Sequence, residues 1–207
     1  MLTIYGKSTS INVRKVLWTC AELQLPFDNP QWGAGHQRTD TPEFLAMNPN
    51  AMVPVLRDGD LILWESNAIC RYLASQYGEG ALLPREPAAR ARVEQWMDWQ
   101  ATELNNAWRY AFMGLVRGSA AHADAAQIAA SGAAWHRHMA IAEAQLARTG
   151  AYLAGPDFTL ADIVFGLSLN RWRMTPLDHP RLPALEDYAA RLAQRAACMT
   201  WCFNGTP

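Results

Sequence analysis

The sequence predicts an α+β domain followed by an all-helical domain. Residues 1–77 alternate strand and helix patterns in the order βαβαββα. Residues 78–87 contain two glycines and two prolines, a composition typical of a linker. From residue 88 to residue 207, apolar side chains recur at three- and four-residue spacings, and no strand pattern is present. We therefore expect two domains, 1–77 and 88–207, joined by the linker 78–87.

The first part of the N-terminal domain contains two strands and two helices. Residues 2–5 are predicted to form a short strand, and residues 12–23 carry an apolar stripe at helical spacing. A weak second strand is expected at 26–27. The polar segment 32–41 is predicted to be a loop, followed by a short helix at 42–47.

The second part is a β-hairpin followed by a helix. Two apolar runs, 53–56 and 61–64, flank an Asp-Gly turn, which is a strong hairpin signal. Ser66 follows directly and is predicted to be the N-cap of the next helix, because a serine side chain can accept a hydrogen bond from a free helical N–H.

The C-terminal domain is predicted to contain four main helices. The first is about 28 residues long, or roughly 42 Å, and ends near Leu115. Further helices are expected at 128–146, 161–172 and from 182 to about 197. Thr159 and Asp162 form a predicted capping box at the start of the third.

Composition excludes several classes of function. The chain has 18 Lys and Arg against 19 Asp and Glu, without a dense basic run, which argues against binding of nucleic acid. No apolar stretch approaches the ~18 residues that a membrane span needs, and the N-terminus has no signal pattern. We expect a soluble cytoplasmic protein.

Cysteine and histidine spacing predicts no metal site. No two cysteines form a C-x-x-C motif, and His136 and His138 lie on different faces of a predicted helix. Buried free thiols are therefore expected at the four cysteines, which are Cys20, Cys70, Cys198 and Cys202.

Pro54 begins an otherwise apolar strand, although proline cannot donate a hydrogen bond to a sheet. One interpretation is that the strand lies at an edge. The other is a cis peptide bond after Val53, which turns the backbone N–H and C=O outward to meet a peptide-like ligand.

Two strand-to-helix junctions carry polar side chains. At Glu65–Ser66, a helix N-terminus and a hydroxyl can bind a carboxylate while Glu65 holds an ammonium, a combination that suits an α-amino acid. At residues 8–12, the hydroxyl and amide groups can donate to a bound thiolate. Ordinary helix capping, by Ser66 and by Ser10, is the alternative at each junction.

Three segments give the chain a family resemblance. They are Asn48–Leu56, Leu63–Leu73 and Phe158–Ile163, and they occur in both domains in the expected order. On these motifs the chain resembles the cytosolic glutathione S-transferases, of the bacterial theta-like type that uses Ser or Asn. The resemblance implies a thioredoxin-like N-terminal domain, an all-α C-terminal domain, and glutathione as co-substrate without a metal.

The resemblance also implies residue roles. Pro54 corresponds to a cis-proline that lets Val53 contact the cysteinyl part of glutathione. Ser66 corresponds to the residue that binds the γ-glutamyl carboxylate, with Glu65 near the amine. Ser10 or Asn12 corresponds to the donor that stabilises the thiolate, and the choice between them stays open.

The chain departs from the family pattern in places. Ala51 and Met52 stand where glycine and a polar residue are usual, so the contact to the glycyl carboxylate falls to His36, Gln37 or Arg38. No cysteine lies near Ser10, which argues against members that form mixed disulfides. The Ser-rich motif of the maleylacetoacetate isomerases is absent. Tyr5 lies too early in the chain to match the catalytic tyrosine of other classes.

A small hydrophobic electrophile is expected to bind between the domains. The candidate residues on the long helix are Asn105, Trp108, Arg109, Phe112 and Met113. Trp172 and Phe203 are further candidates from the C-terminal end. The resemblance implies a homodimer that conjugates this electrophile to glutathione. The alternatives are glutathione-dependent disulfide reduction or dehalogenation, or a non-catalytic glutathione-binding module.

Overall fold

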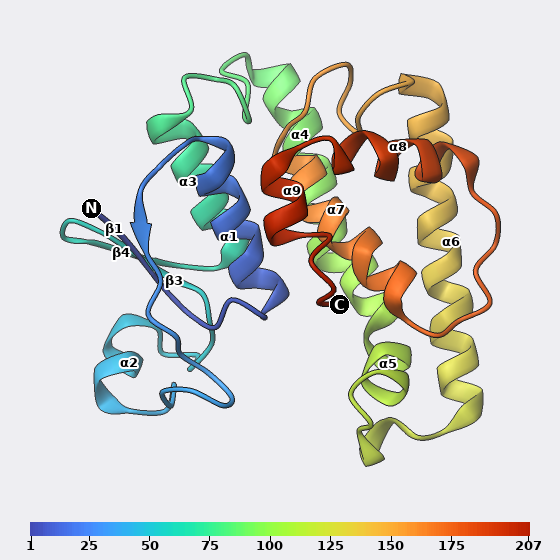
Figure 1. Ribbon diagram of the computed structural model, residues 1–207, viewed down its shortest axis with the longest axis horizontal. Coiled ribbons are helices and arrows are strands. Elements are labelled where there is room, and N and C mark those ends of the chain that lie inside the picture. The colour runs from blue at the N-terminus through green and yellow to red at the C-terminus, as the bar shows by residue number, and fades with distance from the viewer. The chain divides into compact units, whose positions relative to one another are not determined.

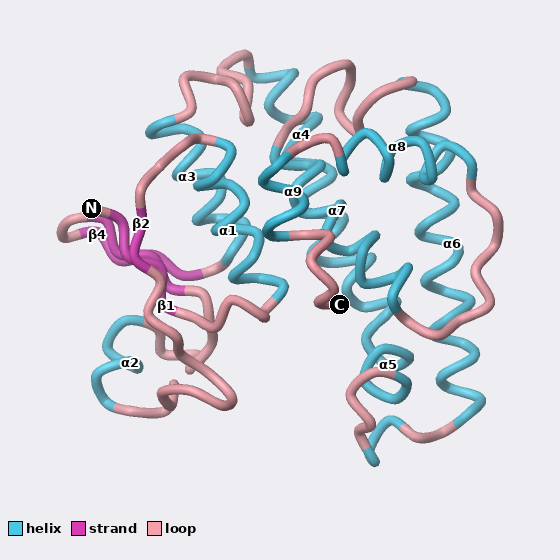
Figure 2. Tube along the Cα trace, viewed as in Figure 1, coloured by secondary structure: helices cyan, strands magenta, loops and turns pink.

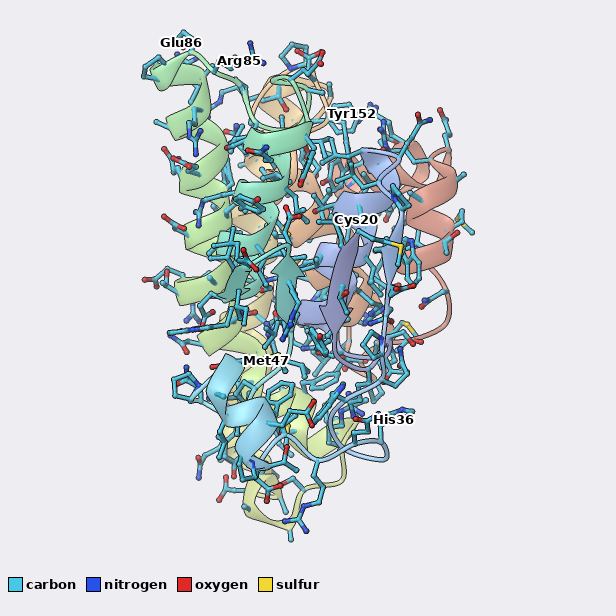
Figure 3. All side chains as sticks on the ribbon, turned by 90° about the vertical axis from the view of Figure 1, so that its left-hand side faces the viewer. Cys20, His36, Met47, Arg85, Glu86 and Tyr152 are labelled. Atoms are coloured by element: carbon cyan, nitrogen blue, oxygen red, sulfur yellow. The ribbon has the colours of Figure 1, made fainter.

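The computed structural model describes all 207 residues, which form two compact units. Unit 1 contains Met1–Arg85 and Ala196–Thr206, and unit 2 contains Glu86–Arg195 with Pro207. Arg85 and Glu86, where the chain leaves unit 1, are labelled in Figure 3 and lie inside the predicted linker.

Unit 1 is built on a four-stranded mixed sheet. The strands are β1 (Leu2–Tyr5), β2 (Phe27–Asp28), β3 (Val55–Asp58) and β4 (Leu61–Trp64). They lie in the order β2-β1-β3-β4, and only the β1–β2 pair is parallel. Figure 2 shows these strands together in magenta. β3 is therefore an internal strand, and β4 lies at an edge.

Helices cover both faces of the sheet in unit 1. Val55 and Leu56 are both fully buried, and neighbouring residues of a strand point to opposite faces. Val55 joins an apolar cluster with residues of α2 (Pro42–Met47), while α1 (Ile11–Glu22) and α3 (Ser66–Tyr77) pack together on the other face (Figure 1). The predicted order βαβαββα and the thioredoxin-like fold are confirmed.

The C-terminal segment belongs to unit 1. The sequence predicts one helix from 182 to about 197, but α8 (Pro183–Ala193) and α9 (Ala196–Trp201) are separate helices. α9 packs against α1, and buried Arg14 donates a 2.8 Å hydrogen bond to the carbonyl of Thr206. The C-terminal domain predicted as 88–207 therefore differs from unit 2, because residues 196–206 are held by α1.

Unit 2 is all-helical, as expected. Its helices are α4 (Pro87–Trp99), α5 (Asn105–Leu115), α6 (Ala125–Thr149), α7 (Leu160–Met174) and α8, with a short 3₁₀ turn at Ala120–His122. A π-helical turn, Gln100–Leu104, joins α4 to α5, so the predicted long helix is interrupted by one wider turn. None of the helices is long and apolar enough to cross a membrane.

The most buried helix of unit 2 begins at the predicted capping box. Asp162 accepts hydrogen bonds from the backbone N–H of Thr159 (2.8 Å) and of Leu153 (3.0 Å), and Tyr188 donates its hydroxyl to the same carboxyl at 3.0 Å. Every residue from 160 to 172 is buried, so this cap fixes the start of the central helix of the unit.

Candidate glutathione site in unit 1

The Val53–Pro54 peptide bond is cis. Pro54 directly precedes β3, which is internal, so the edge-strand interpretation is wrong. The backbone of Val53 forms no hydrogen bond within the protein, although its side chain packs against the cluster that contains Val55. An extended peptide lying alongside Val53 therefore meets a free amide N–H and a free carbonyl.

A buried asparagine shapes the loop before the cis bond. Asn48 donates its side-chain amide to the carbonyl of Met52 at 2.8 Å and accepts from the backbone N–H of Asn50 at 3.0 Å. Ala51 adopts a φ of 54°, a left-handed conformation that favours glycine. This explains why a glycine is usual at Ala51 in the family pattern.

Glu65, not Ser66, is the N-cap of α3. Glu65 has φ 71° and ψ 110°, so the chain turns at Glu65 and Ser66 is already the first helical residue. The prediction of Ser66 as N-cap is therefore wrong by one position. A positive φ in a residue other than glycine is strained and is commonly found at ligand sites.

The two side chains at this N-terminus have opposite environments. Glu65 is exposed, whereas Ser66 is 7% exposed and its hydroxyl has no hydrogen-bond partner within the protein. The first backbone N–H groups of a helix are also without intrahelical partners. A carboxylate can be bound at Ser66 and an ammonium at Glu65, so the arrangement suits an α-amino acid head group.

The loop between β1 and α1 holds the two candidate thiol donors. Ser10 occupies the N-cap position of α1, but its side chain forms no capping hydrogen bond, so capping alone does not explain it. Asn12 is half-buried, and its side chain has no partner either. Both donors are therefore available, and α1 has no acidic residue in its first turn to offset its positive end.

This loop lies next to the cis bond. Gly6 adopts a φ of 148°, and a Cβ atom there would lie 2.5 Å from Cγ2 of Val13 and 3.0 Å from Cβ of Val53. Only glycine fits this close approach without displacing a neighbour. The structure thus brings together the Ser10 loop, the start of α1 and the free backbone of Val53.

The candidates for a glycyl carboxylate differ in availability. Arg38 forms a bidentate ion pair with Asp40, at 2.9 and 2.6 Å, and this pair holds the pKa of the Asp40 carboxyl below its usual range. Gln37 and His36 are exposed, and Figure 3 shows His36 on the loop that precedes α2, the helix that ends at Met47. Gln37 and His36 are therefore better candidates than Arg38.

Lys7 is a further candidate for the glycyl carboxylate. Its Nζ donates to the carbonyl of Ala34 at 3.3 Å, and its stem lies over Gly33, so its ammonium lies on the same loop as Gln37. Lys7 has no ion-pair partner. One signal was present in the sequence: of the 18 Lys and Arg residues only two are lysines, and both, Lys7 and Lys15, fall near the predicted thiol donors.

Tyr5 and the cysteines have structural roles. The ring of Tyr5 contacts the ring of Trp32 edge-on, with centroids 6.4 Å apart, in the apolar cluster. All four cysteines are buried and free, and burial raises the pKa of Cys20 to about 12 and that of Cys70 to about 11. A buried thiol with a raised pKa is unreactive, so Cys20 and Cys70 are not poised for chemistry.

The residues predicted for the electrophile divide into two groups. Asn105 accepts hydrogen bonds from Gln100 (2.9 Å) and Trp108 (3.0 Å) across the π-helical turn, and Phe112 is 2% exposed beneath the guanidinium of Arg171. Asn105, Trp108 and Phe112 thus contribute to packing within unit 2.

The second group has fewer contacts. Arg109 is exposed and Met113 is half-buried, and neither side chain forms a hydrogen bond or an ion pair. Trp172 is buried, with its ring 4.3 Å from that of His179, and Phe203 is half-buried near the end of unit 1. No group of three or more His, Cys, Asp or Glu side chains is arranged to hold a metal ion.

Known proteins resemble the whole chain. Residues 9–76 match the family Glutathione S-transferase, N-terminal domain, and residues 125–201 match Glutathione S-transferase, C-terminal domain. Glutathione S-transferase GstB of Escherichia coli (strain K12) is 41% identical over 199 residues, which cover 95% of each chain.

Solved structures show the same relationship. The theta class glutathione S-transferase of the citrus canker pathogen Xanthomonas axonopodis pv. citri, with glutathione bound, is 40% identical and has a TM-score of 0.92, covering 100% of this chain and 99% of that one. Glutathione transferase F7 of Populus trichocarpa is 26% identical with a TM-score of 0.86, and the match covers 100% of both chains.

Proposed function

Because this chain belongs to the glutathione S-transferase family, it is a glutathione transferase, and we propose that unit 1 binds glutathione along Val53, Glu65 and Ser66. The observation that carries the proposal is the cis bond at Val53–Pro54, which leaves a free peptide edge beside the Ser10 loop. The similar Xanthomonas structure with glutathione bound supports the same ligand here.

Each part of the tripeptide has a proposed partner. The γ-glutamyl carboxylate accepts from Ser66 and the N-terminal N–H groups of α3, and Glu65 pairs with the ammonium. The cysteinyl residue forms two backbone hydrogen bonds with Val53. Gln37 and Lys7 contact the glycyl carboxylate, since Arg38 is already paired with Asp40.

The thiol is activated by a hydrogen-bond donor. Ser10 or Asn12 donates to the sulfur, which lowers the pKa of the thiol so that its proton is released to solvent. The thiolate then attacks an electrophilic carbon. A carbon–sulfur bond forms, the bond to the leaving group breaks, and the group departs with its electron pair. The free hydroxyl of Ser10 at the N-cap position supports this role.

We expect the electrophile to be small and hydrophobic. Arg109 and Met113 are the members of the predicted set with side chains available to a ligand, while Asn105, Trp108 and Phe112 support them from within unit 2. We infer a theta-like class, which the similarity to the Xanthomonas theta class enzyme supports.

The test is binding to immobilised glutathione followed by a conjugation assay with chlorodinitrobenzene. We expect retention on the column and conjugate formation. Retention without turnover would instead identify a non-catalytic glutathione-binding module. Turnover of a disulfide or a haloalkane alone would identify a reductase or a dehalogenase. Failure to bind glutathione would overturn the roles of Glu65 and Ser66.

A further inference from the structure

Two side-chain amides hold the loop that carries the proposed thiol donors. Asn29 follows β2, and its side-chain NH₂ donates to the carbonyl of Ile4 at 2.7 Å and to that of Gly6 at 2.9 Å. Both of its donors are therefore used on the end of β1 and the start of the loop. Nothing in the proposed glutathione contacts involves Asn29.

Gln31 continues this connection to the loop. Its NH₂ donates to the carbonyl of Asn29 at 2.9 Å and to the side-chain oxygen of Asn29 at 2.7 Å. Its own side-chain oxygen accepts the backbone N–H of Ser8 at 2.9 Å. The amide orientation is determined by these partners, because a flipped Gln31 would point its NH₂ at the N–H of Ser8.

Backbone hydrogen bonds and a buried aromatic contact support the amide clasp (Asn29 and Gln31). Backbone hydrogen bonds from Gly6 to Pro30 (3.1 Å) and from Lys7 to Trp32 (2.8 Å) run beside it. The ring of Trp32 is buried against Phe44, with centroids 5.0 Å apart. The same apolar cluster packs against Val53. The clasp therefore connects the loop, through this cluster, to the residue that is proposed to contact the cysteinyl backbone.

The position of this loop sets the distance between the proposed donor side chain, Ser10 or Asn12, and the sulfur of a bound glutathione. Ser8 is two residues before Ser10, and the N–H of Ser10 donates to the carbonyl of Lys7 at 3.0 Å, so Ser8 lies within a hydrogen-bonded turn that ends at Ser10. A displacement of about 1 Å at a reacting group can reduce a rate by about 100-fold. Hydrogen bonds also weaken steeply as their geometry departs from linear.

We propose that Gln31, supported by Asn29, is a positioning residue that places the Ser10 loop against the glutathione sulfur. This inference rests on the proposed function of the site. Gln31 does not touch the tripeptide in this proposal. It acts through Ser10 or Asn12, so its loss affects the thiol pKa and the turnover more than the affinity for glutathione.

The test compares Gln31→Leu, which removes all three hydrogen bonds at similar size, with Gln31→Glu, which keeps an acceptor for Ser8. Gln76→Leu, on the exposed surface of α3, is the matched control. For each variant the glutathione Kd, kcat, and the pH dependence of kcat/KM are measured. We expect Gln31→Leu to lower kcat about 10- to 100-fold and to raise the thiol pKa, with the Kd changed by less than about 3-fold.

A double-mutant cycle shows whether the effect passes through a thiol donor. We expect the change caused by Gln31→Leu to shrink in a Ser10→Ala or an Asn12→Ala background, and the non-additive partner is the donor. Additive losses with both, or an unchanged pH profile in Gln31→Leu, overturn the inference. If Gln31→Leu does not fold, the same shift at smaller size in Gln31→Glu supports it, and an unchanged profile there overturns it.

The same measurements separate this inference from the proposed function. If the unaltered protein binds no glutathione, the proposed function fails, and the positioning role fails with it. If the unaltered protein and Gln76→Leu bind and conjugate glutathione normally while the Gln31 variants keep the same pH profile, the inference on Gln31 alone is overturned.

Discussion

Ser66 is the residue on which glutathione affinity should depend most directly. Ser66 is 7% exposed and its hydroxyl has no partner in the protein, so in the proposed site the γ-glutamyl carboxylate supplies an acceptor. A hydrogen bond to a charged group contributes about 1.5–3 kcal/mol. We therefore expect Ser66→Ala to raise the Kd for glutathione about 10- to 100-fold, with a smaller change in kcat, measured by titration calorimetry and steady-state kinetics.

The control is Ser75→Ala at the other end of α3, which should leave the Kd unchanged. A Ser66→Ala variant with normal affinity would remove Ser66 from the site and leave the positive φ of Glu65 without the proposed explanation.

Lys7 should bind the glycyl carboxylate through its ammonium. We expect Lys7→Met to raise the KM for glutathione about 10-fold, because a charge-assisted contact is lost, and Lys7→Arg to retain most of the affinity. Glutathione esterified at its glycyl carboxylate separates this role from others, since Lys7→Met should not change the KM for the ester. An equal loss with the ester would contradict the assignment.

Individual roles were only partly predictable from the sequence. The cis bond at Val53–Pro54 and the start of α3 near Ser66 could be predicted because each lies in a short motif, whereas the ligand contacts of these residues stay predictions. Gln31 could not be identified, because its importance depends on the N–H of Ser8, 23 residues earlier in the chain. The pairing of Arg38 with Asp40 depends on side-chain rotamers, which a residue list does not specify.

At the scale of elements, the capping box of α7 contains a carboxyl in an unusual state. Burial raises the pKa of Asp162 to about 6, and four hydrogen-bond donors only partly offset this shift. The folded state therefore binds a proton more tightly than the unfolded state. The resulting stabilisation is complete below the unfolded pKa near 3.8 and is lost as the pH rises through about 6.

We therefore expect the stability of the protein to fall with pH relative to that of Asp162→Asn. A shift of about two units corresponds to about 3 kcal/mol in the free energy of unfolding between pH 4 and pH 7. Denaturant titrations of both proteins across this range measure the difference, in which other ionisable groups cancel. Parallel curves for the two proteins would contradict the prediction.

Helix interruptions were less predictable than helix positions. The break between α8 and α9 falls within a continuous apolar pattern, since Cys198 and Cys202 continue the helical spacing. The apolar side chains after the break pack against a different element, because α9 contacts α1. Likewise, the π-helical turn at Gln100–Leu104 leaves the spacing of apolar residues almost unchanged, so periodicity alone reads α4 and α5 as one helix.

In the whole molecule, the near-neutral net charge is consistent with a ligand whose charges are bound by a few nearby protein groups. The two predicted charge partners of the γ-glutamyl group, Glu65 and the N-terminus of α3, lie within one turn of chain. A charged tripeptide therefore needs no large field from the protein surface. In the proposed site, the strand-to-helix junctions of unit 1 carry the ligand contacts, and the positions of these junctions follow from the element order.

The edge strand β4 carries exposed apolar side chains. Leu61, Ile62 and Trp64 of β4 are all exposed, and β4 has a strand partner on one side only. An exposed apolar edge strand is a surface that proteins normally cover. We therefore expect a homodimer in which β4 contributes to the interface, and its state is measured by analytical ultracentrifugation.

The decisive variant introduces a charge into this surface. Ile62 is 37% exposed on β4, so Ile62→Lys should not disturb the core, but it places an ammonium in the expected interface, where burying an unpaired charge is costly. We expect the variant to sediment as a monomer. Ile141, 48% exposed on α6, is the matched control, and Ile141→Lys should remain dimeric. A monomeric unaltered protein, or a dimer that survives Ile62→Lys, would show that β4 is not the interface, and the exposed apolar edge would then require another occupant.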